Sequence, residues 1–174
     1  ASGSVDASIA GRDLNDLADF LANRYPDNVV LQELVSRADS FPGLLTGTRI
    51  DFTGRLDPDS ARLSGQGRAG GTSFDFRVAG ARSLLAGEGR MQLSVTAAND
   101  EGEAVLAAWG VPVLPIGLAG RVETGLQMNG TPGDGFSVSA TVSGPTALLR
   151  VTGDLRTDGN QVRLTGNGEV KGED

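Results

Sequence analysis

The chain offers little of the side-chain chemistry that catalysis or metal binding usually requires. Its 174 residues include neither histidine nor cysteine. Histidine is the commonest general base and metal ligand, and cysteine supplies thiolate nucleophiles and many zinc ligands. The sequence therefore excludes Ser-His-Asp and Cys-His nucleophilic catalysis. It also predicts no metal site and contains nothing that could form a disulfide.

Two clusters of carboxylates remain as candidate acid–base or metal-ligating groups. Asp57-Pro58-Asp59 could be an acid pair, but turns favour the same residues for local hydrogen bonding and a fixed φ. The segment from Asp100 to Glu103 could be an acidic site, but acids at a helix start also interact favourably with the helix dipole. We favour the structural interpretation of both. A sugar-cleaving cleft is usually lined with aromatic side chains, and the chain has only one Trp and one Tyr.

One glycine-rich segment has the spacing of a dinucleotide-binding loop. Residues 65–70 run Gly-Gln-Gly-Arg-Ala-Gly, but the flanking sequence predicts strands on both sides and no following helix. A pyrophosphate site needs a helix N-terminus beneath the phosphates. There is no P-loop either, so we predict that the protein binds no cofactor and is not an enzyme.

The net charge of −7 argues against nucleic acid as a partner, because phosphate binding requires clustered Lys or Arg. The only lysine is Lys171, and the arginines are widely spaced within alternating segments. This spacing indicates a solvated strand face rather than a basic patch. The arginines concerned are Arg49, Arg55, Arg62, Arg68, Arg77 and Arg90.

No segment of the sequence is predicted to span a membrane, because no stretch of 18 apolar residues occurs. The small, polar residues at the start of the sequence have no signal-peptide pattern. An export signal or membrane anchor is therefore expected outside these residues. The acidic balance also weakens any electrostatic attachment to an anionic membrane surface.

Strand signals dominate the sequence. Apolar and polar residues alternate strictly in many segments, which gives each strand one apolar and one polar face. Turn signals such as Asp57–Ser60 and Thr157–Asn160 separate these segments, and Asp-Gly favours a tight hairpin. Neighbouring strands are therefore predicted to be antiparallel and sequential, as in a meander. The alternating segments are 48–56, 61–66, 74–78, 90–96, 118–128, 136–142, 149–155 and 162–165.

Helical periodicity interrupts the strand pattern in two regions. Apolar residues recur at helical spacing from Asp13 to Leu21, with Asp13 as the expected N-cap, and a second helix is predicted from about Val29 to Ala38. Near Asp100, acids precede an Ala- and Leu-rich segment that ends at Gly110.

The two halves of the chain follow the same order of strand, short helix, linker and strands. We divide them at residues 1–92 and 93–174, and a shorter echo relates residues 54–67 to 153–168. The predicted fold is α+β, dominated by antiparallel β: a curved meander sheet of roughly nine strands in two related units, each with a short helix packed at its start. The alternative is two hairpin sets that merely share a composition. The 26 glycines favour a curved or twisted sheet.

The segment from Ala104 to Val122 resembles the repeat of the AsmA family. It has a short helix rich in Leu and Ala, a Gly-X-Pro-X-Leu-Pro linker ending at Pro115, and a strand that opens Leu-X-Gly-Arg-Val. Residues 61–67 and 162–168 are similar to the hairpins of that family. The resemblance covers most of the chain.

The resemblance implies a periplasmic segment of a protein anchored in the inner membrane of a Gram-negative bacterium. Such proteins have a long, open, U-shaped sheet with an apolar inner groove, and they are implicated in phospholipid transport between membranes and in outer-membrane biogenesis. This chain departs from the family in carrying no anchor, and its two units are too few to bridge a periplasm.

The inward-facing apolar side chains are the candidate phospholipid contacts, with ordinary core packing as the alternative for each. They are Ile50, Phe52, Leu63, Phe74, Phe76, Val78, Met91, Leu93, Val122, Leu126, Val138, Val142, Val151 and Leu164. Apolar residues of the helix and linker segments would cap or line one end of the groove, or else pack on the sheet. They are Leu17, Phe20, Leu21, Trp109, Val113, Leu114 and Ile116.

A second class of function stays open from the sequence. The chain could be a structural or adhesive β-repeat module of the cell envelope that binds protein or polysaccharide through its polar strand faces or its sheet edges. An exposed terminal strand could also pair with a second copy and produce a dimer.

Overall fold

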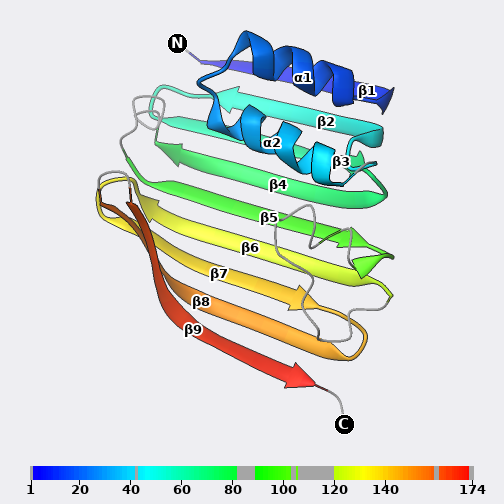
Figure 1. Cartoon of the computed structure of the whole chain (residues 1–174). Helices are drawn as coiled ribbons and strands as arrows, with labels where there is room; N and C mark the ends of the chain where they lie inside the picture. The colour runs from blue at the N-terminus through cyan, green and yellow to red at the C-terminus, as the bar shows by residue number, and fades with distance from the viewer. Residues whose placement is uncertain are drawn as a thin grey trace.

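The computed structural model describes residues 2–41, 43–81, 89–102, 105, 120–158 and 161–172. Over these residues the chain is mostly antiparallel β-structure with two short helices (Figure 1). The strands are β1 (Gly3–Asp13), β2 (Thr46–Leu56), β3 (Ser60–Ala69), β4 (Thr72–Ala81), β5 (Met91–Asn99), β6 (Val122–Thr131), β7 (Gly135–Ser143), β8 (Ala147–Asp158) and β9 (Gln161–Gly172). The helices are α1 (Asn15–Arg24) and α2 (Val29–Ser40).

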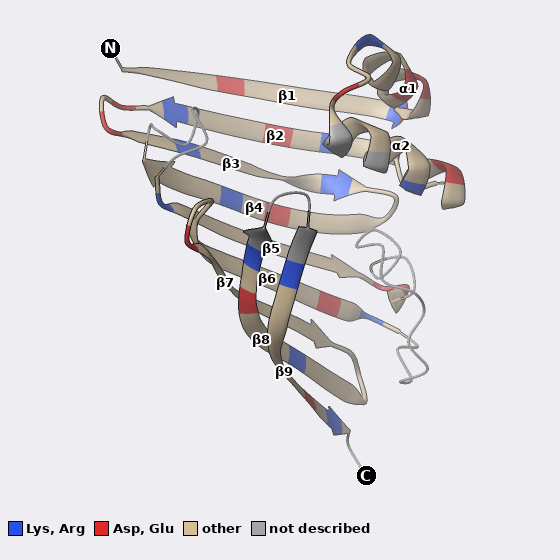
Figure 2. Cartoon of the chain, turned by 60° about the vertical axis from the view of Figure 1, so that its left-hand side comes forward, with Lys and Arg blue, Asp and Glu red and all other residues tan. Residues whose placement is uncertain are grey.

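The described strands form one nine-stranded sheet in the order β1 to β9, and every neighbouring pair is antiparallel. This confirms the predicted meander. Between β3 and β4 the turn contains Gly70 and Gly71, whose φ values are +55° and +79°. Two successive positive φ angles match the tight hairpin turn that suits the twist of the flanking strands. Figure 2 shows the sheet turning progressively, so that parts of β8 and β9 cross the direction of β4 and β5.

The two helices predicted in the first half are confirmed as α1 and α2, but the expected N-cap is wrong. Helix α1 begins at Asn15 and has Leu14 at its N-cap, with no side-chain cap hydrogen bond. Asp13 instead ends β1, where it pairs with Thr46, so the sheet holds its backbone in an extended conformation. Its carboxylate accepts a hydrogen bond from the Asn15 backbone N–H at 2.9 Å. The helix predicted near Asp100 lies largely outside the described residues.

Strand register does not reproduce the shorter sequence echo. Gly54 is directly opposite Leu63 in the β2–β3 hairpin, whereas Gly153, which echoes Gly54, is directly opposite Gly166 in the β8–β9 hairpin and not opposite Leu164, which echoes Leu63. The two hairpins therefore differ by two residues in register at the echoed positions. The division into two related units at residues 1–92 and 93–174, and the curvature of the sheet, stay predictions.

Strand register places apolar side chains on one face of the sheet, here called the apolar face, because directly opposite residues in a ladder project to the same side. Four cross-strand rows of mostly glycine and apolar residues run from β1 to β9. They are Val5-Gly54-Leu63-Val78-Leu93-Met128-Val138-Gly153-Gly166, Ala7-Phe52-Gly65-Phe76-Val95-Leu126-Ala140-Val151-Gly168, Ile9-Ile50-Gly67-Phe74-Ala97-Thr124-Val142-Leu149-Val170 and Gly3-Leu56-Ala61-Gly80-Met91-Gly130-Phe136-Leu155-Leu164.

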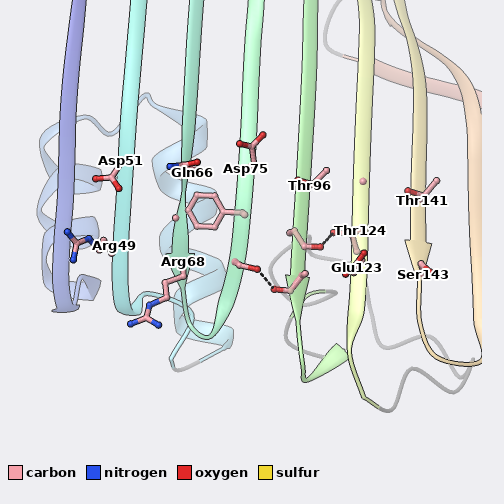
Figure 3. A pocket seen from close by; sticks show the side chains of 16 residues that line it. Arg49, Asp51, Gln66, Arg68, Asp75, Thr96, Glu123, Thr124, Thr141 and Ser143 are labelled. Atoms are coloured by element: carbon pink, nitrogen blue, oxygen red, sulfur yellow. Dashed lines mark hydrogen bonds between the residues drawn. The ribbon is translucent and has the colours of Figure 1, made fainter.

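The intervening rows form the polar face, which is rich in Ser, Thr, Asp, Gln and Arg. The residues of one such row are Ser8-Asp51-Gln66-Asp75-Thr96-Gly125-Thr141-Arg150-Glu169. Helices α1 and α2 lie over β1, β2 and β3 (Figure 1), on the side opposite to the polar side chains drawn in Figure 3. The helices therefore lie on the side of the apolar face, near the N-terminal edge of the sheet.

Few side chains are fully withdrawn from solvent. Among the described residues, the buried hydrophobic ones are Ala18, Ala22, Ala97, Val105 and Val122. Three of these five are alanines, which bury little apolar surface. The described part of the chain is thus a single sheet with a small core and not two closely packed layers.

Candidate functional site

The apolar face is the first candidate site, because all the predicted lipid-contacting residues lie on it. Strand alternation and the ladder registers place every one of these side chains on the same side of the sheet. They come from β2 to β9, so the structure spreads them over most of the sheet. The face spans roughly 38 Å across its nine strands at about 4.8 Å per strand spacing.

The exposure of these residues distinguishes an open face from a closed core. Val122 is fully buried, whereas Leu63 and Leu164 are 43% and 56% exposed. The remaining predicted contacts are half-buried. On the flanking strand β1, Val5 and Ile9 are 63% and 40% exposed. Most of the apolar face therefore keeps contact with solvent in the described structure.

Two aromatic rings mark the middle of the N-terminal half of this face. Phe52 and Phe76 lie on either side of Gly65 in one cross-strand row. Their ring centroids are 6.0 Å apart and the ring planes are tilted by 60°. Because Gly65 has no Cβ, the two rings can approach across the strand between them. This is the tilted geometry that aromatic pairs favour.

The predicted cap residues of α1 are mostly exposed. Leu17 and Phe20 are 43% and 64% exposed, and Leu21 is half-buried. The residues that α1 buries are Ala18 and Ala22. The helical periodicity led us to expect that the larger side chains would be the ones that pack. The i, i+4 spacing of Ala18 and Ala22 was the sequence signal for the face that is buried. Trp109, Val113, Leu114 and Ile116 lie outside the described residues.

The polar face carries a hollow that the sequence analysis did not predict. Its volume is about 950 Å³, and it extends over β2 to β7 (Figure 3). Charged groups of both signs line it, among them Arg49, Asp51, Arg68, Asp75 and Glu123. A second hollow of about 560 Å³ on this face is lined by residues that include Arg77, Gln92 and Gln127. Alternation predicts which side chains share a face, but it contains no information about hollows.

Ion pairs on the polar face are exposed. Arg77 lies 3.4 Å from Asp75, and Arg121 lies 3.2 Å from both Asp100 and Glu123. The hydrogen bond to Glu123, and to a smaller extent the one to Asp100, raises the pKa of Arg121 above its ordinary value. Exposed pairs of this kind contribute little to stability, but they leave those arginines neutralised by neighbours.

The carboxylate clusters have structural roles where the structure describes them. Asp57 lies in the β2–β3 turn, where its backbone N–H donates to the Ser60 carbonyl at 2.8 Å and its carboxylate accepts from the Ser60 hydroxyl at 3.4 Å. This confirms the turn interpretation. Asp100 pairs with Arg121, as above. Across the described ranges, no three Asp or Glu side chains are grouped so that they could hold a metal ion.

The glycine-rich segment at residues 65–70 is also structural. It runs along β3 into the tight turn and leads to β4. The interpretation that no helix follows it is confirmed, so this segment lacks the geometry of a dinucleotide loop.

Comparisons with protein families, with curated proteins and with solved structures yield no match to this chain. Within the described ranges, neither helix has the length and apolar character needed to cross a membrane. The described fold is therefore an open antiparallel sheet with one apolar and one polar face and with two helices over its N-terminal end.

Proposed function

We propose that this chain is a non-catalytic periplasmic segment of an AsmA-like envelope protein and that its apolar face contacts phospholipid acyl chains. The parent protein would be anchored in the inner membrane and would act in phospholipid transport between membranes or in outer-membrane biogenesis. The observation that carries the proposal is an apolar face that is continuous across nine strands and still largely half-exposed.

The energetic basis is the removal of methylene groups from water. Each buried CH₂ contributes about 0.8 kcal/mol, so half-shielding an acyl chain of about sixteen carbons gives roughly 6 kcal/mol. No catalytic group is needed for this effect. An exposed apolar surface of this extent is unusual on a monomer and marks an interaction site.

In this proposal the sheet curves towards the apolar face, and the two related units each contribute strands to one groove. The hollow on the polar face is compatible with such a groove. A twisted sheet is saddle-shaped, so each of its faces can be concave along one diagonal. The apolar residues outside the described ranges are proposed to cap one end.

The test is native mass spectrometry of the purified chain, followed by organic extraction of bound molecules. We expect co-purified phospholipid on the parent chain and its loss in Leu126→Asp and Phe76→Asp. The matched control is Gln127→Asp, which adds the same charge at the next residue of β6 but on the exposed polar face. Circular dichroism must show that all variants keep the strand signal.

A protein free of lipid, with a mass unchanged by incubation with phospholipid vesicles, would contradict the proposal. That result would favour the second candidate, a structural or adhesive module that binds protein or polysaccharide. The observation favouring it is that, among the described strands, β1 and β9 each pair with a single neighbour and so form the two edges of the sheet. In that case the lipid-free chain would associate with itself or with a partner through these edges.

A further inference from the structure

Four arginines on the β2–β3 hairpin are brought together by strand register. Arg49 is directly opposite Arg68, and Arg55 is directly opposite Arg62. All four are exposed and project from the polar face (Figure 2 shows the two ends of each strand in blue). We call these four residues the arginine strip.

Like charges directly opposite each other destabilise a sheet, whereas opposite charges stabilise it. In the strip each pair is flanked by small uncharged residues on the neighbouring strands. On β1, Ala10 is directly opposite Arg49 and Ser4 is directly opposite Arg55. On β4, Ser73 is directly opposite Arg68 and Ala79 is directly opposite Arg62. A ladder that opposes like charges, with no carboxylate directly opposite either arginine of a pair, breaks a local folding rule, as functional sites often do.

The guanidinium groups of the strip are also available. Within the described residues, none of the four takes part in a hydrogen bond or an ion pair. By contrast, Arg77 and Arg121 on the same face both pair with carboxylates. Two arginine side chains that start from directly opposite residues are long and flexible enough to turn towards one phosphate group and bind it through several charge-assisted hydrogen bonds. Binding of an anion would also remove the repulsion within each pair.

We propose that the arginine strip binds an extended, phosphate-bearing polyanion that lies lengthwise along the β2–β3 hairpin. The two pairs are six residues apart on each strand, which corresponds to roughly 20 Å. A single small anion cannot reach both pairs, but a linear chain with repeated phosphates can. Thr53 and Ser64 lie between the pairs, but their hydroxyls already donate, to the Asp6 carboxylate at 2.9 Å and to the Thr53 carbonyl at 3.4 Å, so the arginines supply the contacts with the ligand. Asp51 also lies within this length, so it opposes the ligand.

The distribution of charge favours a linear polyanion over a lipid surface. The strip is one hairpin wide and is bordered by Asp6 on β1 and Asp75 on β4. A broad anionic surface would meet those carboxylates together with the arginines, and the net charge of −7 would repel it. Nucleic acid is disfavoured because the only aromatic residue of the hairpin, Phe52, lies on the apolar face, and unstacked bases need aromatic platforms.

This proposal concerns the polar face and is independent of lipid binding by the apolar face. The test is fluorescence anisotropy of a labelled linear polyphosphate, long enough to reach both pairs, titrated with the whole chain. Four phosphate contacts at about 0.7 each predict a slope of about −2.8 in log affinity against log salt. The affinity should then fall about 50-fold between about 50 and 200 mM salt.

Variants separate the strip from general electrostatics. Arg49→Gln with Arg68→Gln should halve the slope to about −1.4, which is about a 7-fold loss over the same salt range, and so should Arg55→Gln with Arg62→Gln. The control Arg121→Gln with Arg150→Gln changes the net charge equally. It removes arginines that lie beside carboxylates, since Arg150 is directly opposite Glu169. This control should keep the slope near −2.8.

Asp51→Asn provides a test of opposite sign, because loss of its charge should tighten polyphosphate binding. The proposal is overturned if the control weakens binding as much as the pair variants do, or if polyphosphate does not bind at low salt. Binding confined to vesicles of phosphatidylglycerol and phosphatidylcholine, with none to soluble polyphosphate, would also overturn it in favour of a membrane surface.

Discussion

Replacement of Gly65 by alanine tests whether the apolar face is arranged as described. Gly65 is buried and lies between Phe52 and Phe76 in one cross-strand row. An added Cβ would overlap the Phe76 ring, at 2.6 Å from its Cζ, and would lie 3.2 Å from Cδ1 of Phe52. Carbon atoms prefer about 3.5–4.0 Å, so the Phe76 ring must move.

The expected effect on the free energy of unfolding is the sum of three contributions. Loss of the ring pair costs about 0.5–1.5 kcal/mol. Forcing Phe76 away from its preferred rotamer costs about 0.5–1.5 kcal/mol. Alanine restricts the unfolded chain more than glycine does, which returns about 0.4–1 kcal/mol. The midpoints combine to a net destabilisation of about 1.3 kcal/mol.

The assay is equilibrium unfolding in urea, followed by the far-ultraviolet circular dichroism of the strands. The midpoint should shift to lower urea while the slope stays constant, which indicates a change in stability and not in the denatured state. The matched control is Gly3→Ala, because a Cβ at Gly3 meets nothing within 4 Å. Its midpoint should be unchanged or slightly raised.

A second background identifies the cause. In a Phe76→Leu chain there is no ring pair to lose and no ring to displace, so only the gain of about 0.4–1 kcal/mol remains and Gly65→Ala should be slightly stabilising. The difference between the two backgrounds should be about 2 kcal/mol, which lies in the range found for residues in contact. An equal loss of stability in both backgrounds, or a gain in the parent chain, would refute the assigned contact between Gly65 and the aromatic pair.

Two further predictions concern the elements that hold the sheet together. Asn99 is 7% exposed; its amide donates to the Thr72 hydroxyl at 2.9 Å, and its side-chain oxygen accepts from the Glu101 backbone N–H at 2.8 Å. Asn99→Ala should lower the free energy of unfolding, measured in urea, by about 2–3 kcal/mol, because buried partners lose their hydrogen bonds. The control Asn129→Ala at an exposed site should change it by less than about 0.5 kcal/mol. Similar losses in the two variants would contradict the role of Asn99. The Asn28 side chain caps α2 by accepting from the Leu31 backbone N–H at 3.1 Å. Asn28→Ala should destabilise that helix by about 1 kcal/mol, which would be measured as faster hydrogen exchange of the α2 amides. Asp27→Ala is the neighbouring control, and unchanged exchange in Asn28→Ala would show that the cap is not needed.

Much of the fold could be predicted because its signals are local. Strict alternation defines the two faces of each strand, and Asp, Pro, Asn and Gly between the segments define the turns. Short turns between successive strands leave an antiparallel meander as the simplest connection. The same alternation assigned residues as distant as Ile50 and Leu164 to one face, because the side-chain period of a strand is two whichever neighbour it pairs with.

Local signals were insufficient where a neighbouring element decides the outcome. Asp13 has the residue type of an N-cap, but pairing with Thr46 extends β1 through it and moves the helix start to Asn15. In α1 the larger residues Leu17 and Phe20 were expected to pack, whereas Ala18 and Ala22 are buried. Which side of a helix is covered depends on what packs against it, and that is a property of the tertiary structure.

The sequence by itself therefore determined the strands, the turns and the composition of each face, since these depend on residues a few positions apart. Only the tertiary structure decided how far the apolar face stays open, because exposure depends on whether another layer covers it. Strand register likewise decided the arrangement of charge. Arg49 and Arg68 are far apart in the sequence, where their spacing indicated a dispersed, solvated face, and the β2–β3 ladder places them directly opposite each other. Pairing between strands joins residues that no local pattern relates, and it is this pairing that creates the arginine strip.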